Sequence, residues 1–193
     1  MSKPSIGFIG LGLMGGNMVE NLQNKGYPVT VMDLNQAAVQ KCVERGAKTA
    51  QTGKALAEAS DIVMLCLTTS EIVEKVIYAE NGVLEGLKAG AVLIDFGTSI
   101  PASTRKIGAD LAAKGVGMID APLGRTPAHA KDGLLNIMAS GDIDTFNKVK
   151  SVLEDQGENV FHLGALGAGH TTKLINNFMG MTTVCAMSQA FAV

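Results

Sequence analysis

Gly10-Leu11-Gly12-Leu13-Met14-Gly15 directly follows the apolar run Ser5-Ile6-Gly7-Phe8-Ile9 and opens a helix-like stretch from Met14 to Lys25. In such a strand–turn–helix unit the first glycine permits a tight turn, and the second lets the backbone approach a pyrophosphate. The third glycine brings the helix close against the strand, so that the phosphates of a dinucleotide meet the helix N-terminus. The stretch therefore predicts a dinucleotide site at Gly10, Gly12 and Gly15. The alternative is a structural glycine turn before a buried helix.

An acidic residue in the expected place favours the dinucleotide site. Val29-Thr30-Val31-Met32 is typical of a second strand, and Asp33 follows it directly. A carboxylate at this position accepts hydrogen bonds from the ribose hydroxyls of NAD and repels the 2′-phosphate of NADP. Leu34 and Asn35 come next, rather than an arginine that would bind that phosphate. We therefore expect NAD as the cofactor, with NADH preferred over NADPH.

Strand-like and helix-like segments alternate along the chain. Most of the strand-like segments are short, continuous apolar runs, which are typical of parallel strands covered by helices on both faces. The predicted strands are Ile6–Ile9, Val29–Met32, Lys48–Ala50, Ile62–Leu65, Val92–Asp95, Gly117–Asp120, Leu134–Ala139 and Asn159–His162. The predicted helices between them are Met14–Lys25, Gln36–Arg45, Gly53–Ala59, Glu71–Tyr78, Pro101–Lys114 and Asp142–Glu154. The fold class is α/β: a Rossmann-type, doubly wound, mainly parallel sheet followed by the start of a long interdomain helix.

The last predicted helix differs from the others. From Thr171 a helical pattern runs to Val193 and is apolar on several faces, which a helix needs only where it is buried on several sides. One sheet domain cannot supply that burial. We expect residues 1–164 to form an NAD-binding domain. Residues 165–193 would begin an interdomain helix that leads to an all-helical C-terminal domain absent from this sequence.

Composition excludes several classes of function. The 193 residues are 47% hydrophobic, 18% charged and carry a net charge of −2, so a large core can form without a basic surface for nucleic acid or an anionic membrane. Leu174 to Val193 is apolar but includes Asn176, Asn177, Ser188 and Gln189, and is too polar to span a membrane. The sequence predicts a cytoplasmic protein.

The cysteines and histidines suggest no metal site. Three cysteines lie far apart and fit reduced thiols in a cytosolic protein. The histidines likewise lack the spacing of metal ligands, and we interpret them as ordinary core or surface residues. These residues are Cys42, Cys66, Cys185, His129, His162 and His170.

Candidate catalytic residues follow from the rule that ligands bind beyond the carboxyl ends of the strands in an open parallel sheet. Lys173 and Asn177 lie four residues apart on the last predicted helix, with Asn176 and Gly180 near the same face. An ammonium group can donate a proton to a carbonyl oxygen that becomes an alkoxide as hydride arrives. An adjacent amide can hold that ammonium and bind a substrate hydroxyl. The alternative is a solvated lysine on an exposed face.

Two further residues each have two interpretations. Arg125 follows a Pro-Leu-Gly turn, and its planar fork of donors suits the carboxylate, sulfonate or phosphate of a ligand. The alternative is an ion pair with a nearby carboxylate of the protein, such as Asp120. Thr98 either contacts the ribose or nicotinamide side of the cofactor, or Thr98 or Ser99 caps the helix that begins at Pro101.

Four motifs in order resemble the β-hydroxyacid dehydrogenase family, which includes 3-hydroxyisobutyrate dehydrogenase, tartronate semialdehyde reductase and 6-phosphogluconate dehydrogenase. The motifs are Phe8-Ile9-Gly10-Leu11-Gly12-Leu13-Met14-Gly15, Asp95 through Thr98, Asp120-Ala121-Pro122, and Gly167-Ala168-Gly169-His170 with Lys173, Asn176 and Asn177. The resemblance covers essentially the whole chain. It implies a Rossmann domain followed by an all-helical domain, through which family members usually form homo-oligomers. The residues implied to hold NAD are Leu13, Met14, Asp33, Leu67 and Thr98.

The same resemblance implies a small anionic aldehyde or hydroxy acid as substrate, with Lys173 as the catalytic acid. The loop Gly124-Arg125-Thr126 is similar to that of the family's sulfolactaldehyde-reducing members, which implies reduction of 3-sulfolactaldehyde to 2,3-dihydroxypropane-1-sulfonate in sulfoglycolysis. Arg125 would hold the sulfonate. The residues implied to line the substrate are Arg125, Thr126, Asn176, Asn177, Phe178, Met179 and Gly180. A carboxylate substrate, as in 3-hydroxyisobutyrate dehydrogenase or tartronate semialdehyde reductase, is the alternative, and a non-catalytic NAD-binding module is a third.

Overall fold

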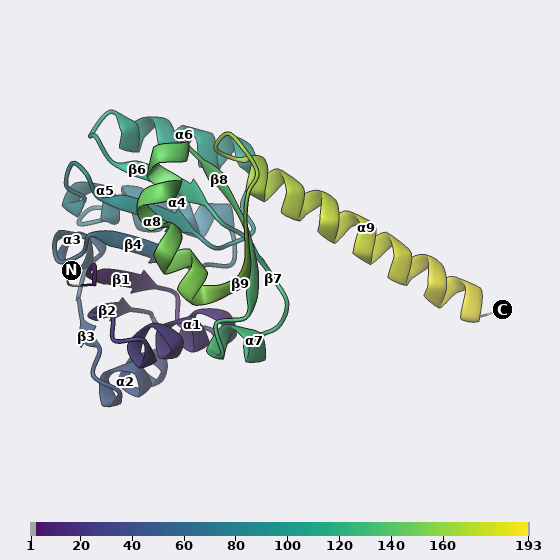
Figure 1. The fold of residues 1–193 in the computed structure, drawn as a ribbon, viewed down its shortest axis with the longest axis horizontal. Helices are drawn as coiled ribbons and strands as arrows, with labels where there is room; N and C mark the ends of the chain where they lie inside the picture. The colour runs from purple at the N-terminus through teal and green to yellow at the C-terminus, as the bar shows by residue number, and fades with distance from the viewer. Residues whose placement is uncertain (1–2, 193) are drawn as a thin grey trace.

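A computed structural model describes residues 3–192 and shows one twisted sheet with helices on both faces (Figure 1). The strands are β1 (Ile6–Ile9), β2 (Val29–Met32), β3 (Lys48–Thr49), β4 (Ile62–Leu65), β5 (Val92–Asp95), β6 (Gly117–Asp120), β7 (Leu123–Gly124), β8 (Leu135–Gly141) and β9 (Gly157–His162). The helices are α1 (Leu13–Asn24), α2 (Gln36–Glu44), α3 (Gly53–Glu58), α4 (Ser70–Tyr78), α5 (Val83–Gly86), α6 (Pro101–Ala112), α7 (Pro127–Lys131), α8 (Ile143–Gln156) and α9 (Ala168–Phe191).

The strand order β3-β2-β1-β4-β5-β6-β8-β7 confirms the predicted doubly wound sheet. The first six strands in this order are parallel, whereas β8 runs antiparallel to β6, and β9 pairs with β8 in parallel. The chain leaves β1 toward β2 on one side and returns to β4 on the other. In open sheets of this kind, ligands bind beyond the carboxyl ends of the strands at the point where the strand order reverses, which here lies between β1 and β4.

The continuous apolar runs produce two cores, one on each face of the sheet. In β4, Ile62 and Met64 pack in the core beneath α1, α2 and α8, whereas Val63 and Leu65 pack in the core beneath α3 to α6. Because side chains alternate between the faces of a strand, only a strand buried on both sides can be apolar at every position. This is why the apolar parallel strands β1 and β4 could be predicted with the bounds that the structure shows, whereas the exposed β3 ends at Thr49, one residue before its predicted end.

Three short elements were not predicted: β7, α5 and α7. The strand expected from Leu134 begins one residue later and extends to Gly141, because its last residues pair with β6. The segment after His162 turns into α9, which leaves the sheet and projects away from the rest of the molecule (Figure 1). Only Gly169 and His170 of α9 are buried, and Val193, the predicted end of this helix, lies outside the described residues. No helix within residues 3–192 combines the length and apolar character needed to cross a membrane.

Candidate active site

The glycine loop has the geometry expected of a backbone that approaches a ligand. Gly10 has φ of +97°, a left-handed conformation that favours glycine, and a Cβ on Gly15 would collide with the Gly10 carbonyl. Gly12, in contrast, has open space within 4 Å of where a Cβ would stand, and it begins α1 without a side-chain cap. The first and third glycines are therefore required by packing. The second leaves the N-terminus of α1 accessible, which fits the pyrophosphate of a dinucleotide.

Asp33 lies at the end of β2 and contacts the glycine loop directly. Its Oδ2 accepts a hydrogen bond from the backbone N–H of Leu11 at 2.5 Å, and its Oδ1 accepts one from Asn35 at 2.7 Å. The carboxylate is half-buried, and the following Leu34 is fully exposed. Asp33 therefore holds the glycine loop, a structural role that the sequence pattern does not reveal.

Leu67 and Thr98 follow β4 and β5 at the same edge of the sheet, and both are half-buried. The interpretation that Thr98 or Ser99 caps α6 is wrong. The N-cap position of α6 is Ile100, whose backbone N–H donates to the Ser70 hydroxyl at 2.8 Å, while the Ser99 hydroxyl donates to Asp95 at 2.8 Å. Thr98 therefore makes no cap of α6.

The start of α9 is held on the carboxyl ends of β6 and β8. The carboxylate of Asp120 accepts backbone hydrogen bonds from Gly167 and His170, each at 2.8 Å, and the Ser140 hydroxyl accepts one from Gly169 at 2.8 Å. A Cβ on Gly169 would collide with the carbonyl of Met138. An anionic side chain at a helix N-terminus is stabilising, so this arrangement anchors α9 at the ligand-binding edge.

Lys173 lies one turn beyond that anchor. Its Nζ donates a hydrogen bond to the carbonyl of Leu123 at 2.5 Å, and desolvation lowers the pKa of this half-buried lysine. The loop that begins at Leu123 is also tied to α1, because the Asn17 amide donates to the carbonyl of Pro127 at 3.0 Å. Lys173 therefore points at a loop that connects α9 with the nucleotide-binding helix. Asn17 was not singled out from the sequence, since nothing near it in the chain indicates this contact.

The remaining predicted substrate residues on α9 are exposed, with 69% of Phe178 and 61% of Met179 accessible to solvent. Asn176, Asn177 and Gly180 are exposed as well. The structure therefore places these residues on the helix that carries Lys173, without a contact that orders their side chains around a ligand.

Arg125 adopts φ of +76°, and its guanidinium forms an ion pair with Glu158 at 2.5 Å and donates to the carbonyl of Leu134 at 2.7 Å. Arg125 therefore pairs with a carboxylate, as its alternative interpretation has it, but the partner is Glu158 and not Asp120, which is wholly buried and bonded to the start of α9. The neighbouring Thr126 is exposed and its hydroxyl lies 2.7 Å from Nδ1 of His129.

His170 is a residue whose environment the sequence reasoning missed. It is wholly buried, and its ring lies between Asp95 and Asp120, with Nδ1 2.8 Å from the Thr104 hydroxyl. Burial raises the pKa of Asp95, an effect that the nearby imidazole opposes. A histidine three residues before Lys173 on the same helix was the only local sign of this arrangement. Within residues 3–192, no cluster of three or more His, Cys, Asp or Glu side chains could hold a metal ion.

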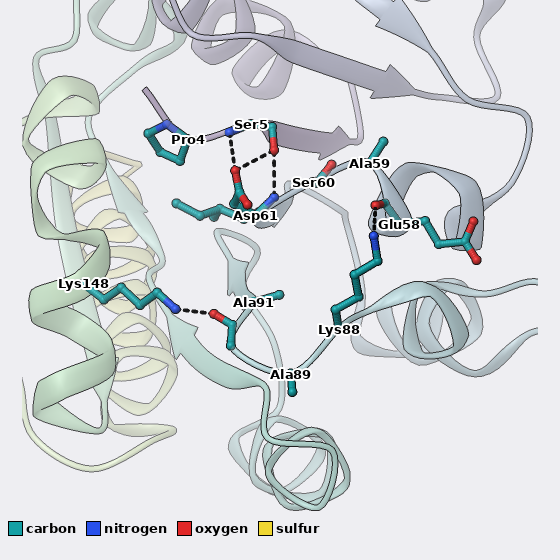
Figure 2. A pocket seen from close by; sticks show the side chains of 12 residues that line it. Pro4, Ser5, Glu58, Ala59, Ser60, Asp61, Lys88, Ala89, Ala91 and Lys148 are labelled. Atoms are coloured by element: carbon teal, nitrogen blue, oxygen red, sulfur yellow. Dashed lines mark hydrogen bonds between the residues drawn. The ribbon is translucent and has the colours of Figure 1, made fainter. Parts of the chain in front are cut away.

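A cavity of about 560 Å³ lies at the opposite edge of the sheet, near the amino ends of β1, β4 and β5 (Figure 2). Three of its side chains are bonded within the protein. Asp61 accepts hydrogen bonds from the backbone and hydroxyl of Ser5, Lys88 donates to the carbonyl of Glu58, and Lys148 donates to that of Gly90. None of the residues that line the cavity belongs to the glycine loop.

Comparison with known proteins agrees with this architecture. Residues 5–164 match the family described as the NAD binding domain of 6-phosphogluconate dehydrogenase. The chain is 37% identical over 186 residues to 3-sulfolactaldehyde reductase of Escherichia coli and 36% identical over 188 residues to 2-(hydroxymethyl)glutarate dehydrogenase of Eubacterium barkeri. These alignments cover 96% and 97% of this chain but 62% of each relative.

A solved structure of 3-hydroxyisobutyrate dehydrogenase from Mycobacterium tuberculosis, with L-serine, superimposes with a TM-score of 0.92 at 27% identity. That match covers 99% of this chain and 65% of the solved one. The chain belongs to the NAD-binding domain family of 6-phosphogluconate dehydrogenase, in the group that includes the 3-hydroxyisobutyrate dehydrogenases. The predicted family and an NAD(P)-binding domain are confirmed. The chain spans less than two thirds of the length of these relatives.

Proposed function

We propose that this protein is an NADH-dependent reductase that converts 3-sulfolactaldehyde to 2,3-dihydroxypropane-1-sulfonate. The observation that carries the proposal is the placement of the Lys173 ammonium, half-buried and bonded to Leu123 at the carboxyl edge of the sheet. A general acid must reach the carbonyl oxygen of a substrate bound beside the nicotinamide, and this edge is where the fold binds dinucleotides.

The residues present fit an NAD molecule. The open space at Gly12 and the uncapped start of α1 would hold the pyrophosphate, and Asp33 would accept the ribose hydroxyls. Leu13 and Met14 would lie along the phosphates, with Leu67 and Thr98 toward the nicotinamide. Bound NADH supplies the hydride that adds to the carbonyl carbon.

Lys173 would give its proton to the carbonyl oxygen, which becomes the hydroxyl of the product. Partial desolvation lowers the pKa of Lys173, and a weaker hold on the proton makes the ammonium a better acid. The amide of Asn177, one turn further along α9, would bind the same oxygen or a substrate hydroxyl. Asn176, Phe178, Met179 and Gly180 would line the substrate from the same helix.

The sulfonate assignment rests on the loop of Arg125 and Thr126. A guanidinium fork binds sulfonate and carboxylate in similar ways, and relatives named for both kinds of acid have nearly equal identity to this chain. A carboxylate substrate is therefore the second candidate. The guanidinium of Arg125 is paired with the carboxylate of Glu158, so the sulfonate of a bound substrate would have to replace that carboxylate.

Substitution of Lys173 tests the chemistry. Lys173→Ala should reduce turnover with NADH and 3-sulfolactaldehyde by at least about 10²-fold, the contribution typical of a general acid, while the Kd for NADH stays unchanged. The neighbouring Thr172→Ala is a matched control, because Thr172 is exposed on the same turn. Near-normal turnover by Lys173→Ala would show that the proton comes from elsewhere.

Substitution of Arg125 tests the substrate. Glycine tolerates φ of +76°, so Arg125→Gly removes the charge without adding backbone strain. We expect the KM for 3-sulfolactaldehyde to rise by about 10-fold or more, as for loss of a charged hydrogen bond, with little change for an uncharged aldehyde. Wild-type kcat/KM for sulfonate and carboxylate aldehydes, measured side by side, decides between the two substrates. Equal changes for charged and uncharged aldehydes would refute the role of Arg125.

The proposal includes NADH rather than NADPH as the cofactor. Solved structures of this fold hold NADP+ in one case and NAD+ in another, so the fold does not decide between them. The proposal also places the boundary of the NAD-binding domain between residues 164 and 165. In the whole protein, a helical domain would pack on the exposed α9 and mediate self-association, and the protein would be cytoplasmic.

A further inference from the structure

The ion pair between Arg125 and Glu158 depends on two irregularities of the backbone. Arg125 directly follows β7 and adopts φ of +76°, a left-handed conformation that is uncommon for a residue other than glycine. Glu158 lies at a bulge of β9, as an extra residue without a counterpart in β8. β7 and β9 pair with opposite sides of β8, so the two side chains meet across the end of that strand. Irregularities of this kind are common next to binding sites, where they direct a side chain.

The pair is close, but it is open to solvent. Nη1 of Arg125 lies 2.5 Å from Oε2 of Glu158 and donates a hydrogen bond to the carbonyl of Leu134 at 2.7 Å. Water reaches 29% of the Arg125 side chain and 52% of the Glu158 side chain. An ion pair this exposed contributes little to stability, because water and salt compete with it. The carboxylate of Glu158 can therefore leave the guanidinium when another anion replaces it.

The pair also stands apart from the ion pairs that join elements of the fold. Within residues 3–192, Glu158 forms an ion pair with Arg125 alone, and Arg125 forms none with another acid. Asp155, in contrast, pairs with both Lys3 and Lys25. The strands that carry Arg125 and Glu158 are already joined to β8 by backbone hydrogen bonds. The fold therefore does not need this contact to hold β7 and β9 in place.

The segment that carries Arg125 is the one that Lys173 contacts. The Lys173 ammonium donates to the carbonyl of Leu123, two residues before Arg125 in the chain. An acid group bound to Arg125 would therefore be held by the same short segment that meets the proposed proton donor. Glu158 is the carboxylate that now occupies Arg125 at this point.

We propose that Glu158 is an internal competitor for the acid group of the substrate, and that it thereby sets the affinity of the site for anionic ligands. The acid group of a bound aldehyde would replace the carboxylate at Arg125, and Glu158 would turn to solvent. This inference rests on the proposed function, in which Arg125 binds that acid group. Reduction of the carbonyl leaves the acid group unchanged, so Glu158 competes with substrate and product alike and promotes release of the product.

Binding of a sulfonate that cannot react tests the competition directly. The probe is 2-hydroxyethanesulfonate, and its Kd is measured from the NMR signals of the backbone amides of Gly124 and Thr126. Glu158→Gln keeps the shape of the side chain and removes its charge. We expect this variant to lower the Kd of the probe by about two- to fivefold, the range for loss of an exposed ion pair.

Glu154→Gln is the matched control for the change in net charge. Glu154 forms an exposed ion pair with Lys150 on α8, so its substitution should leave the Kd of the probe unchanged. A Kd in Glu158→Gln that equals the wild-type value would overturn the proposal. A higher Kd would also overturn it, because Glu158 would then orient Arg125 for the ligand instead of competing with it.

Arg125→Gly shows whether Glu158 acts through the guanidinium. Competition requires Arg125, whereas a general repulsion of anions by Glu158 would persist without it. In a double-mutant cycle, we expect Glu158→Gln to have no effect on the Kd of the probe once Arg125 is glycine. An equal effect in both backgrounds would refute the competition. If Arg125→Gly alone leaves the Kd unchanged, Arg125 binds no acid group, and the anion-binding part of the proposed function fails together with this inference.

Kinetics of the whole protein extend the test to the reaction. In Glu158→Gln, the KM for 3-sulfolactaldehyde and the inhibition constant of its reduced product should fall together by about two- to fivefold, with kcat not raised, because the acid group binds equally well throughout. The KM for glyceraldehyde, which has no acid group, should stay unchanged. An equal fall for both aldehydes would refute the role of Glu158. Normal turnover in Lys173→Ala would refute the proposed proton donor and leave the Kd of the sulfonate probe unaffected.

Discussion

The proposed preference for NADH over NADPH would depend on one carboxylate, that of Asp33, and Asp33→Asn is the substitution that tests it. The amide retains one acceptor oxygen, so it can keep one of the two backbone hydrogen bonds that Asp33 makes to Leu11 and Asn35. Any loosening of the glycine loop will weaken both cofactors alike. The ratio of their dissociation constants therefore reports the effect of the charge alone.

The size of the effect follows from the surroundings of Asp33. The side chain is half-buried next to a fully exposed Leu34, so the water-like limit of about 1 kcal/mol per charge pair at ~4 Å applies. A 2′-phosphate carries nearly two charges, which makes the repulsion about 2 kcal/mol. NADH also exchanges a charge-assisted hydrogen bond for a neutral one, a loss of about 1 kcal/mol. Together these lower the NADH preference on the order of 10²-fold.

The assay is calorimetric titration of this chain with NADH and with NADPH, at low and at high salt, which gives the Kd of each cofactor. The preference in the wild type should weaken as salt screens the repulsion, and Asp33→Asn should remove that salt dependence. Asp61→Asn is a matched control, because Asp61 also accepts a backbone N–H before a strand, at the opposite edge of the sheet (Figure 2). A ratio within twofold of the wild type in Asp33→Asn would refute this account of the cofactor choice.

Three further outcomes are expected. Gly12→Ala should keep the wild-type melting temperature, because its Cβ meets open space, but should lose NADH binding at the start of α1. Gly15→Ala should fail to fold stably, because its Cβ would collide with the Gly10 carbonyl, and equal losses of Tm in the two variants would contradict this account. The proposed reductase activity should fall with rising pH, because Lys173 must be protonated to act as the acid. The fall should begin below pH 10.5, because desolvation lowers the pKa of Lys173; a kcat–pH profile in which activity falls only at or above pH 10.5 would contradict this prediction. Iodoacetamide at mildly alkaline pH should label the exposed Cys185 before Cys66, whose pKa burial raises to about 12, as peptide mass spectrometry can verify.

The parallel sheet could be predicted from the sequence because its signal is local. Strands such as β1 and β4 are short continuous apolar runs between turn residues, a pattern typical of strands that are covered on both faces. The two-residue strand β7 has no such signal, since it forms only by pairing with Ile137 and Asn136 of β8. The short helices α5 and α7 have four and five residues, too few for a helical period to be seen.

The residues of the candidate site likewise fall into those that local sequence predicts and those that it does not. The glycine loop and Asp33 follow a spacing that can be found within about thirty residues of sequence. The partner of Arg125 could not, because Glu158 reaches it only through the pairing of β9 with β8, which shifts register at Leu135 and Asn136. His170 likewise meets Thr104 across 66 residues. Such contacts depend on the order of strands in the finished sheet, which no local pattern specifies.

The carboxyl edge of the sheet is built from aspartates that hold the chain just beyond it. Asp33 after β2, Asp95 at the end of β5 and Asp120 at the end of β6 each accept backbone N–H groups from a loop or helix start. Asp95 and Asp120 are wholly buried and fully used by the protein, whereas Asp33 is half-buried. Because a buried carboxylate cannot bind a ligand without losing its internal partners, only Asp33 is able to serve both the loop and a ribose. The other two act on the reaction only through what they anchor, which for Asp120 is the helix that carries Lys173.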